Sequence, residues 1–272
     1  MPLYQAVILA VVQGLAEFLP ISSTAHLILF PWLLGWKDPG LTFDVALHVG
    51  TLVAVAVYFR REWIRMGEAA LGLSAGTDAA RTERRLLWFL VAGTIPGGIA
   101  GFLLEHAAEE KFRQPWLISL SLIVVGLLMW AGDRTEGHEK SIERTSLADA
   151  LWIGLAQAFA VVPGVSRSGS TMTAGLFRGM SRESSARFSF LLATPLIAGA
   201  ALFKGFELRH TGLAPEMRLP FFAGIVVSGL VGYVVVAFLL RYLAHRTFKI
   251  FVIYRLVLGV VVLLLGWFLR HA

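Results

Sequence analysis

Runs of apolar residues separated by short polar segments set the pattern of this chain. Six runs are long enough to cross a membrane as helices, which takes about 20 residues each. The polar, arginine-rich segment 62–85 separates two of them, and we expect it to be a connecting loop with room for a short surface helix. The pattern predicts an all-α polytopic membrane protein with spans near residues 43–59, 86–104, 116–131, 188–203, 220–240 and 248–269.

Two further apolar stretches, 3–34 and 148–180, are each interrupted by polar and helix-breaking residues. Pro20 and the hydroxyl residues at 22–24 break the first, and the segment 163–171 breaks the second. Each half of the first stretch has about 14 residues, roughly 21 Å of helix, which is too short for a hydrocarbon core about 30 Å thick. We therefore expect each stretch to form a re-entrant helical hairpin whose break lies in protein or in a wet cavity.

The two halves of the chain share one layout, a broken hairpin followed by three spans. They also align directly: at an offset of 144 positions, Gln13 meets Gln157 and Ser22 meets Ser166. Because three spans per half is an odd number, the second copy must enter the membrane inverted, and inverted repeats with broken helices place a ligand site at their interface. We expect one membrane domain made of a first repeat, a charged linker and a second, inverted-topology repeat, at 1–131, 132–146 and 147–272.

Composition and charge support a membrane protein and suggest its orientation. The chain is 57% hydrophobic and only 15% charged, and it has no cysteine, which excludes disulfides and thiolate metal sites. The net charge of +6 comes from Lys and Arg residues that lie mostly between apolar runs. They concentrate on one side of the predicted topology, which the positive-inside rule makes cytoplasmic. Both termini are then outside, and the first hairpin enters from outside and the second from the cytoplasm.

The first broken stretch carries candidate catalytic groups. An ionisable residue inside a membrane segment indicates a functional site by default. Gln13 and Glu17 share a helix face, so they could hold a divalent cation through oxygen atoms, or Glu17 could act alone as a base. Pro20 ends that helix, and one of the hydroxyl residues Ser22, Ser23 and Thr24 can cap the next one, which places His26 in its first turn.

The second broken stretch has the features of a phosphate site. Ser166, Arg167, Ser168 and Thr171 lead into a helix at 172–177, and free amides at a helix start beside an arginine fork bind phosphate. A phosphate held between the two breaks would face Arg167 and hydroxyl groups on one side, and Glu17 and His26 on the other. This combination suits phosphoryl transfer.

Several of these residues also have purely structural interpretations. Ser and Thr near a proline in a membrane helix commonly satisfy freed backbone groups. Asp44 and His48 could face the same cavity, but we interpret them as a polar turn at the membrane interface. Arg255, inside the last apolar run, is either a further phosphate ligand or a partner for a buried acid such as Glu17.

The two motifs point to a known family. The stretches QGLAEFLPISSTAH (13–26) and PGVSRSGST (163–171) resemble the two signature motifs of the bacterial undecaprenyl-diphosphate phosphatase family, which is linked to bacitracin resistance. The similarity extends to TFDVAL (42–47) and FSFLLA (188–193) and to the pattern of spans along the whole chain. The family is described as having interlocked inverted repeats, in agreement with the duplication.

This resemblance implies an integral membrane hydrolase that converts undecaprenyl diphosphate to the monophosphate with a divalent cation, Mg²⁺ or Ca²⁺, and so recycles the carrier lipid for peptidoglycan. The family's acidic motif falls on Gln13 and Glu17, and Gln at 13, where many members have Glu, weakens any two-carboxylate metal site. For the attacking group we favour His26 over Ser23 or an activated water. The phosphate ligands would be Arg167 together with the hydroxyl residues Ser166, Ser168, Thr171, Ser22 and Thr24.

The main alternative is a transporter or flippase that moves an anion or an anionic lipid through the same midplane site. We expect the partners to be a polyprenyl diphosphate and the lipid bilayer, with no nucleic acid, and the chain could form a homodimer. The expected location is the bacterial plasma (inner) membrane, with the site opening to the outer, periplasmic face.

Overall fold

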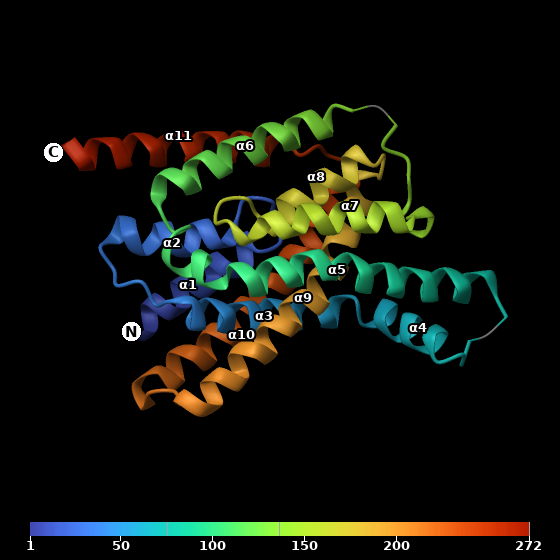
Figure 1. Cartoon of the computed structure of the whole chain (residues 1–272), viewed down its shortest axis with the longest axis horizontal. Coiled ribbons are helices and arrows are strands. Elements are labelled where there is room, and N and C mark those ends of the chain that lie inside the picture. Colours follow the sequence, from blue (N-terminus) through green and yellow to red (C-terminus); the bar gives the residue numbers. More distant parts are fainter. Residues whose placement is uncertain (75, 136, 272) are drawn as a thin grey trace.

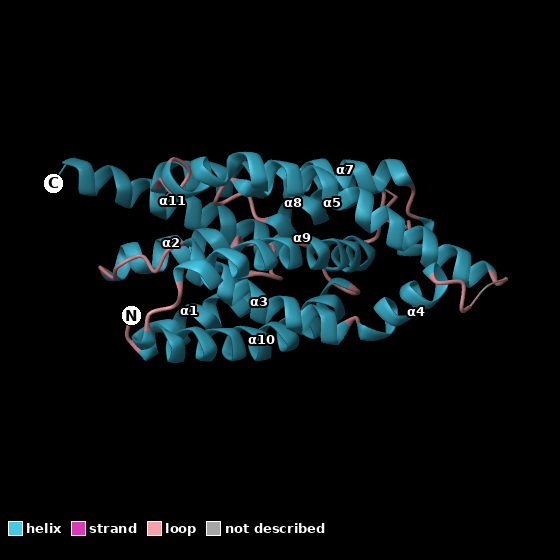
Figure 2. Ribbon diagram, turned by 60° about the horizontal axis from the view of Figure 1, so that its bottom comes forward, coloured by secondary structure: helices cyan, strands magenta, loops and turns pink. Residues whose placement is uncertain are grey.

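The computed structural model describes residues 1–74, 76–135 and 137–271. Helices make up the fold, and no strand occurs in these three ranges (Figure 2). The only extended pairing in them is an isolated bridge between Lys140 and Met180. In chain order the elements are α1 (Leu3–Ala16), α2 (Ser23–Leu34), α3 (Leu41–Tyr58), α4 (Arg60–Ala70), α5 (Asp78–Glu110), α6 (Pro115–Asp133), η1 (Ile142–Arg144), α7 (Leu147–Ala158), η2 (Phe159–Val161), α8 (Arg167–Phe177), α9 (Arg182–Thr211), α10 (Pro215–Leu243) and α11 (Lys249–His271).

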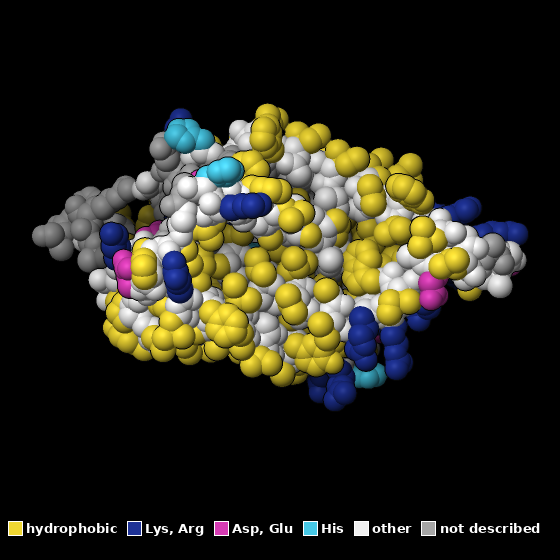
Figure 3. Space-filling model, turned by 90° about the horizontal axis from the view of Figure 1, so that it is seen from below, with side chains coloured by type: hydrophobic (Ala, Val, Ile, Leu, Met, Phe, Trp, Pro, Cys, Tyr) yellow, Lys and Arg dark blue, Asp and Glu magenta, His cyan; other side chains and the backbone are white. Residues whose placement is uncertain are grey.

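Six helices of the described ranges, α3, α5, α6, α9, α10 and α11, are long and apolar enough to cross a membrane. They coincide with the six spans that the apolar runs predict. Apolar side chains cover the middle of the surface in Figure 3, while Lys and Arg lie mostly toward its ends, as expected for a protein surrounded by lipid. The multi-pass membrane architecture is therefore confirmed.

The expected boundaries need correction at the ends of the spans. The segment 62–85 is largely helical, because α4 covers Arg60–Ala70 and α5 already begins at Asp78, eight residues before the expected start. Thr77 caps α5 by accepting a hydrogen bond from the Ala80 N–H, so the helix begins with a polar turn that hydropathy does not reveal. The linker 132–146 overlaps the end of α6 and contains η1, and its residue 136 lies outside the described ranges.

Both broken stretches are pairs of short helices. The chain breaks between α1 and α2 at 17–22, and between α7 and α8 at 159–166. The helix α8 begins at Arg167, five residues before the expected start at 172. The two re-entrant stretches therefore have the predicted helix–break–helix form, whereas their inverted-repeat relationship stays a prediction.

The two halves of the chain interlock. In the first half, α1 and α3 pack on α10, α5 packs on α7 and α9, and α6 packs on α11. Glycines allow the closest of these approaches: a methyl group at Gly93 of α5 would lie 2.9 Å from the Ala150 carbonyl of α7. The two ends of the chain lie at the same end of the molecule, and α4 lies at the other (Figure 1). This interlocking brings the two breaks together in the interior.

Candidate functional site

A serine with an unusual backbone conformation begins the second helix of each hairpin. Ser22 has φ 76° and Ser166 has φ 70°, and they are the only non-glycine residues with positive φ in the part of the chain that the structure describes. Such a conformation costs of order 1–3 kcal/mol and persists only where the surroundings impose it. Each hydroxyl accepts a hydrogen bond from the N–H three residues on, at Ala25 and at Gly169. The two breaks thus share one capping device, with Ser22 as the actual cap of α2.

Hydrogen bonds tie the two breaks to each other. The Gly164 N–H donates to Ser22 Oγ at 3.2 Å, across 142 residues of sequence. Gly164 has φ +94°, and a methyl group there would meet the Ile118 carbonyl at 2.6 Å, so both the turn and the packing against α6 require glycine. The Ser168 hydroxyl donates to the Leu19 carbonyl at 3.2 Å. Parts of the chain that are far apart in sequence therefore meet at one point.

Arg255 of α11 connects the two breaks. The predictions that it binds phosphate or pairs with Glu17 are both wrong. The side chain is fully buried, and its guanidinium contacts neither Glu17 nor the cavity described below. It donates instead to backbone carbonyl oxygens of the two breaks and of α6. The acceptors, with their distances, are Gly164 (2.8 Å), Pro20 (3.1 Å), Val165 (3.2 Å), Leu122 (3.3 Å) and Ser121 (3.4 Å).

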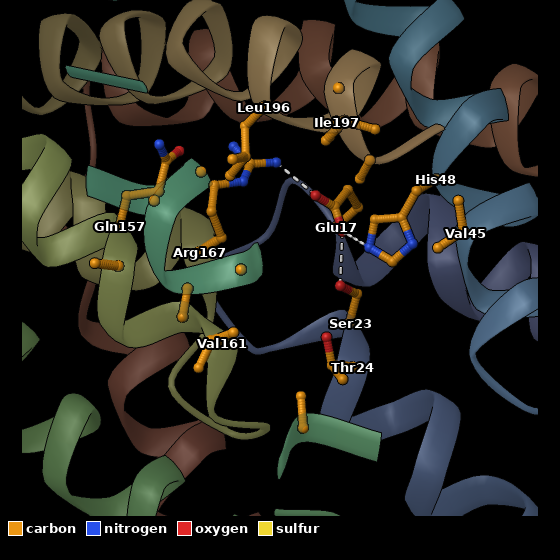
Figure 4. Close-up of a pocket in the computed structure, with 18 of the residues that line it drawn as sticks. Glu17, Ser23, Thr24, Val45, His48, Gln157, Val161, Arg167, Leu196 and Ile197 are labelled. Carbon is orange, nitrogen blue, oxygen red and sulfur yellow. Dashed lines mark hydrogen bonds and ion pairs between the residues drawn. The ribbon is translucent and has the colours of Figure 1, made fainter. Parts of the chain in front are cut away.

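Glu17 is the centre of the polar site. It follows the last residue of α1, is 5% exposed, and its carboxylate accepts hydrogen bonds from side chains of both hairpins and of α3 (Figure 4). The burial of a carboxylate is tolerable only with such compensation. Its donors are Arg167 Nη2 (2.5 Å), Ser23 Oγ (2.7 Å), Gln13 Nε2 (3.1 Å) and His48 Nε2 (3.2 Å).

His48 belongs to this site, although its sequence position favoured an interfacial turn. Its Nδ1 lies 2.7 Å from the Asp44 carbonyl oxygen and its Nε2 lies 3.2 Å from the Glu17 carboxylate. Both partners are acceptors when Glu17 is ionised, so the ring satisfies both contacts only with a hydrogen on each nitrogen. With the ring protonated in this way, the site holds two cations, Arg167 and His48, around one anion, which leaves one positive charge for an anionic ligand. The sequence offers this position for His48 only as the less favoured alternative, because only the fold turns the side chain toward Glu17.

A cavity of about 550 Å³ connects this polar cluster to an apolar wall. Both breaks, α3, α5 and α9 line it, and the polar cluster forms one side of it (Figure 4). An apolar wall of the cavity consists of small and apolar residues of α5 and α9, among them Gly97, Gly101, Phe102, Leu196 and Phe203. A cavity with a charged end and an apolar wall fits a ligand with an anionic head and an apolar tail.

The structure brings most of the expected phosphate ligands to this cavity. Arg167 lines it and is also held by a hydrogen bond to the Ser189 carbonyl. Thr171 lies elsewhere: its hydroxyl donates to the Arg167 carbonyl within α8 and contacts Ser189 Oγ. The hydroxyl residues of the two motifs that do line the cavity are Ser22, Ser23, Thr24, Ser166 and Ser168.

His26 lies apart from the cavity lining. Its Nδ1 is 2.7 Å from the Ser22 carbonyl oxygen, which only accepts, so Nδ1 carries the hydrogen. Its Nε2 is then left to accept from the Tyr254 hydroxyl, which lies at 2.7 Å and on whose ring the imidazole stacks. Ser23, in contrast, lines the cavity and donates to Glu17. The geometry of a nucleophile beside a base occurs at Ser23.

The oxygen atoms at this site could hold a cation only with help from a ligand. The described residues contain no group of three or more His, Cys, Asp or Glu side chains arranged for a metal ion. Gln13 Oε1, however, is buried without a hydrogen-bond partner, directly beside the Glu17 carboxylate. One carboxylate and one amide oxygen suit Mg²⁺ or Ca²⁺ when phosphate oxygens and water complete the coordination.

Comparison with known proteins gives consistent matches along the chain. A model of the family described as bacitracin resistance protein BacA matches residues 6–261. An undecaprenyl-diphosphatase of Pelotomaculum thermopropionicum is 50% identical over 266 residues, which is 98% of this chain and 97% of that protein. The undecaprenyl-diphosphatases of Moorella thermoacetica (47% over 270 residues; 99% and 100% covered) and Geobacter sulfurreducens (49% over 265 residues; 97% and 98% covered) are similar to it along nearly the same length.

Proposed function

The chain belongs to the bacitracin resistance protein BacA family, and we propose that it is an undecaprenyl-diphosphatase. It removes the terminal phosphate of the prenyl diphosphate, releasing phosphate and undecaprenyl phosphate, which recycles the carrier lipid for peptidoglycan synthesis and confers bacitracin resistance. The observation that carries the proposal is the hydrogen bond from Ser23 Oγ to Glu17, beside Arg167, in a cavity with an apolar wall.

In the proposed reaction, Arg167 binds the terminal phosphate and Ser23 Oγ attacks its phosphorus. The Ser23 proton passes to Glu17, the bond between the terminal phosphorus and the bridging oxygen breaks, and prenyl monophosphate leaves with this proton on the former bridging oxygen. Water then attacks the phosphoserine and gives a proton to Glu17, the bond between phosphorus and Ser23 Oγ breaks, and Glu17 returns the proton to Oγ as inorganic phosphate leaves. Arg167 and His48 stabilise the charge that spreads over the phosphate oxygens.

Ser23 replaces His26 as the attacking group that we favour. Attack by His26 would need Nε2 free and facing the phosphate, whereas this atom accepts from the Tyr254 hydroxyl and the ring does not line the cavity. We propose instead that His26 is a positioning residue, because its Nδ1 binds the Ser22 carbonyl and so fixes the first turn of α2 next to Ser23.

A divalent cation, Mg²⁺ or Ca²⁺, would be held by Glu17 and Gln13 together with the diphosphate. When bound, such an ion would neutralise part of the negative charge of the phosphates. The free oxygen of Gln13 supports this proposal.

We further propose that the cavity opens to the outer face of the bacterial plasma membrane. Arg113, between α5 and α6, and Lys204, near the end of α9, line it, and these helix ends lie toward the same end of the molecule as both termini (Figure 1). The distribution of Lys and Arg between the two sides favours termini that lie outside. A homodimer stays a prediction.

The test is phosphate release from undecaprenyl diphosphate by the purified protein in detergent, with chelator and then with Mg²⁺ or Ca²⁺ restored. We expect release that needs the cation and falls at least 1,000-fold in Ser23→Ala, Glu17→Ala and Arg167→Ala. Ser170→Ala is the matched control, because this serine lies in the same motif but off the cavity.

The outcomes separate the alternatives. A Ser23→Ala variant that keeps substantial turnover would contradict the serine route. An acid-labile phosphoenzyme from labelled substrate would instead indicate a histidine. A well-folded wild type that releases no phosphate with any cation would favour the alternative function, a transporter or flippase.

A further inference from the structure

Gln157 of α7 is a buried amide without a partner. The residue is 2% exposed, and neither its Nε2 nor its Oε1 has a hydrogen-bond partner. Leaving a buried polar group unsatisfied costs about 1–3 kcal/mol. This cost indicates that a partner arrives from outside the chain.

The internal alignment explains why the amide is free. Gln157 aligns with Gln13, and Gln13 donates to the carboxylate one turn later, at Glu17. The residue one turn after Gln157 is Val161, which offers no acceptor. The second hairpin therefore presents the same amide with nothing to bind.

Gln157 lines the cavity on the far side of the arginine from Glu17. In Figure 4, the Arg167 side chain lies between Gln157 and Glu17. On its other side, the amide packs on the backbone of α5, where a methyl group at Gly97 would lie 3.0 Å from Gln157 Nε2. Its position is thus between the phosphate-binding arginine and the apolar wall.

We infer that the Gln157 amide binds the lipid-linked phosphate of the prenyl diphosphate. This inference rests on the proposed function. The terminal phosphate must lie beside Ser23 for attack, and the tail must run along the apolar wall of α5 and α9. The lipid-linked phosphate lies between these two parts of the ligand, and the Gln157 side chain offers an unpaired amide at that point. The monophosphate product keeps this phosphate, so Gln157 binds the product as well.

The variant Gln157→Met tests the inference, because methionine has a similar volume and no hydrogen-bonding group. A hydrogen bond to a charged group contributes about 1.5–3 kcal/mol, so we expect KM for undecaprenyl diphosphate to rise about tenfold or more. The inhibition constant of undecaprenyl monophosphate should rise by the same factor, while inhibition by inorganic phosphate and kcat change little. The Tm should stay level or rise, because the buried amide has no partner to lose.

A pair of glycine variants offers a matched control. Gly97→Ala pushes a methyl group against the Gln157 amide, whereas Gly205→Ala in α9 adds a methyl group outside the cavity lining, where nothing lies within 4 Å. Both changes replace a helical glycine by a better helix former, and only Gly97→Ala should weaken monophosphate binding.

Three results would overturn the inference. The first is a lower Tm of Gln157→Met with an unchanged KM. The second is inhibition by inorganic phosphate that weakens in Gln157→Met as much as inhibition by the monophosphate does. The third is equal monophosphate binding by the two glycine variants. Direct binding of undecaprenyl monophosphate separates this inference from the proposed function. If the wild type released no phosphate while Gln157→Met bound undecaprenyl monophosphate more weakly than the wild type does, the proposed function would fail and the Gln157 site would stand.

Discussion

Replacing Arg255 with methionine should destabilise the protein more than any other loss of a single charge outside the Glu17 cluster. The guanidinium is fully buried among carbonyl oxygens, and three of them, at Pro20, Gly164 and Val165, lie in the two breaks. The other two lie in α6, where the helix offers its own hydrogen bonds.

The three carbonyls in the breaks determine the magnitude. Each buried acceptor left without a donor costs about 1–3 kcal/mol, which gives roughly 3–9 kcal/mol in total. Relief of the buried charge offsets part of this cost, so we expect a net loss of about 3–5 kcal/mol, similar to the removal of one partner from a buried ion pair. At about 2–4 °C per kcal/mol, the Tm should fall by roughly 10 °C.

Thermal unfolding in detergent measures this loss, and hydrogen exchange locates it. Exchange should accelerate at 17–22 and 163–166, the segments that Arg255 joins. Arg255→Lys should lie between wild type and Arg255→Met, because an ammonium group has three donors and no fork. Lys249→Met is the control, since it removes an exposed cation from the start of the same helix. A Tm of Arg255→Met within 2 °C of the wild type would refute the reasoning.

Two further predictions concern His48 and Asp149. His48→Asn should lower kcat up to about 100-fold, because Glu17 loses a donor that fixes its position; an unchanged rate of phosphate release would show that Glu17 is held without it. Burial alone would raise the pKa of Asp149, outside the six spans, but hydrogen bonds from the Ser146 N–H, Arg178, the Ser146 hydroxyl and Lys140 lower this pKa to about 2. The stabilisation is present above the unfolded pKa of about 3.9 and is lost as pH falls toward 2, so Asp149→Asn should cost about 1–2 kcal/mol at pH 7 by thermal unfolding. The difference from wild type should narrow only below about pH 4, and a constant difference would contradict this assignment.

Hydropathy predicts the spans well because lipid requires continuous apolar helices. It does not predict where the helices end. α5 begins at Asp78 with a Thr77 cap, and α9 continues to Thr211, because a helix that leaves the hydrocarbon can extend into water with polar residues. Only the apolar core of each span is visible in the sequence.

At the site, likewise, the sequence reveals the residue types that carry the chemistry but not the contacts that these residues make. The motifs revealed Glu17, Ser23 and Arg167, because charged and hydroxyl groups stand out in apolar surroundings. Arg255 stood out equally, but its partners are backbone carbonyls, which every residue carries and no pattern marks. The first motif predicts that His26 faces the phosphate, whereas its Nε2 meets the hydroxyl of Tyr254, 228 positions away.

The contact between Glu17 and Arg167 has a consequence for ligand binding. The guanidinium that is expected to bind phosphate already holds a carboxylate, at 2.5 Å, with both side chains at most 10% exposed. An incoming phosphate must therefore compete with Glu17 for Arg167. Before the ligand binds, the Glu17 carboxylate therefore occupies the anion position at Arg167. Once phosphate has replaced this carboxylate at the arginine, Glu17 is free to take a proton from Ser23.

Competition of this kind predicts that Glu17→Gln binds inorganic phosphate more tightly than the wild type while losing turnover. The change keeps the side-chain volume, removes the anion from Arg167, and should improve affinity about tenfold or more when a chelator excludes any cation, since 1.4 kcal/mol corresponds to tenfold. Calorimetric titration with phosphate measures the effect. Asp44→Asn is the matched control, because it removes the same charge from the first turn of α3. Its partner Arg113 stays paired with Asp38 at 2.8 Å, so phosphate affinity should change far less. Equal or weaker binding by Glu17→Gln would show that Glu17 helps to bind phosphate instead of competing with it.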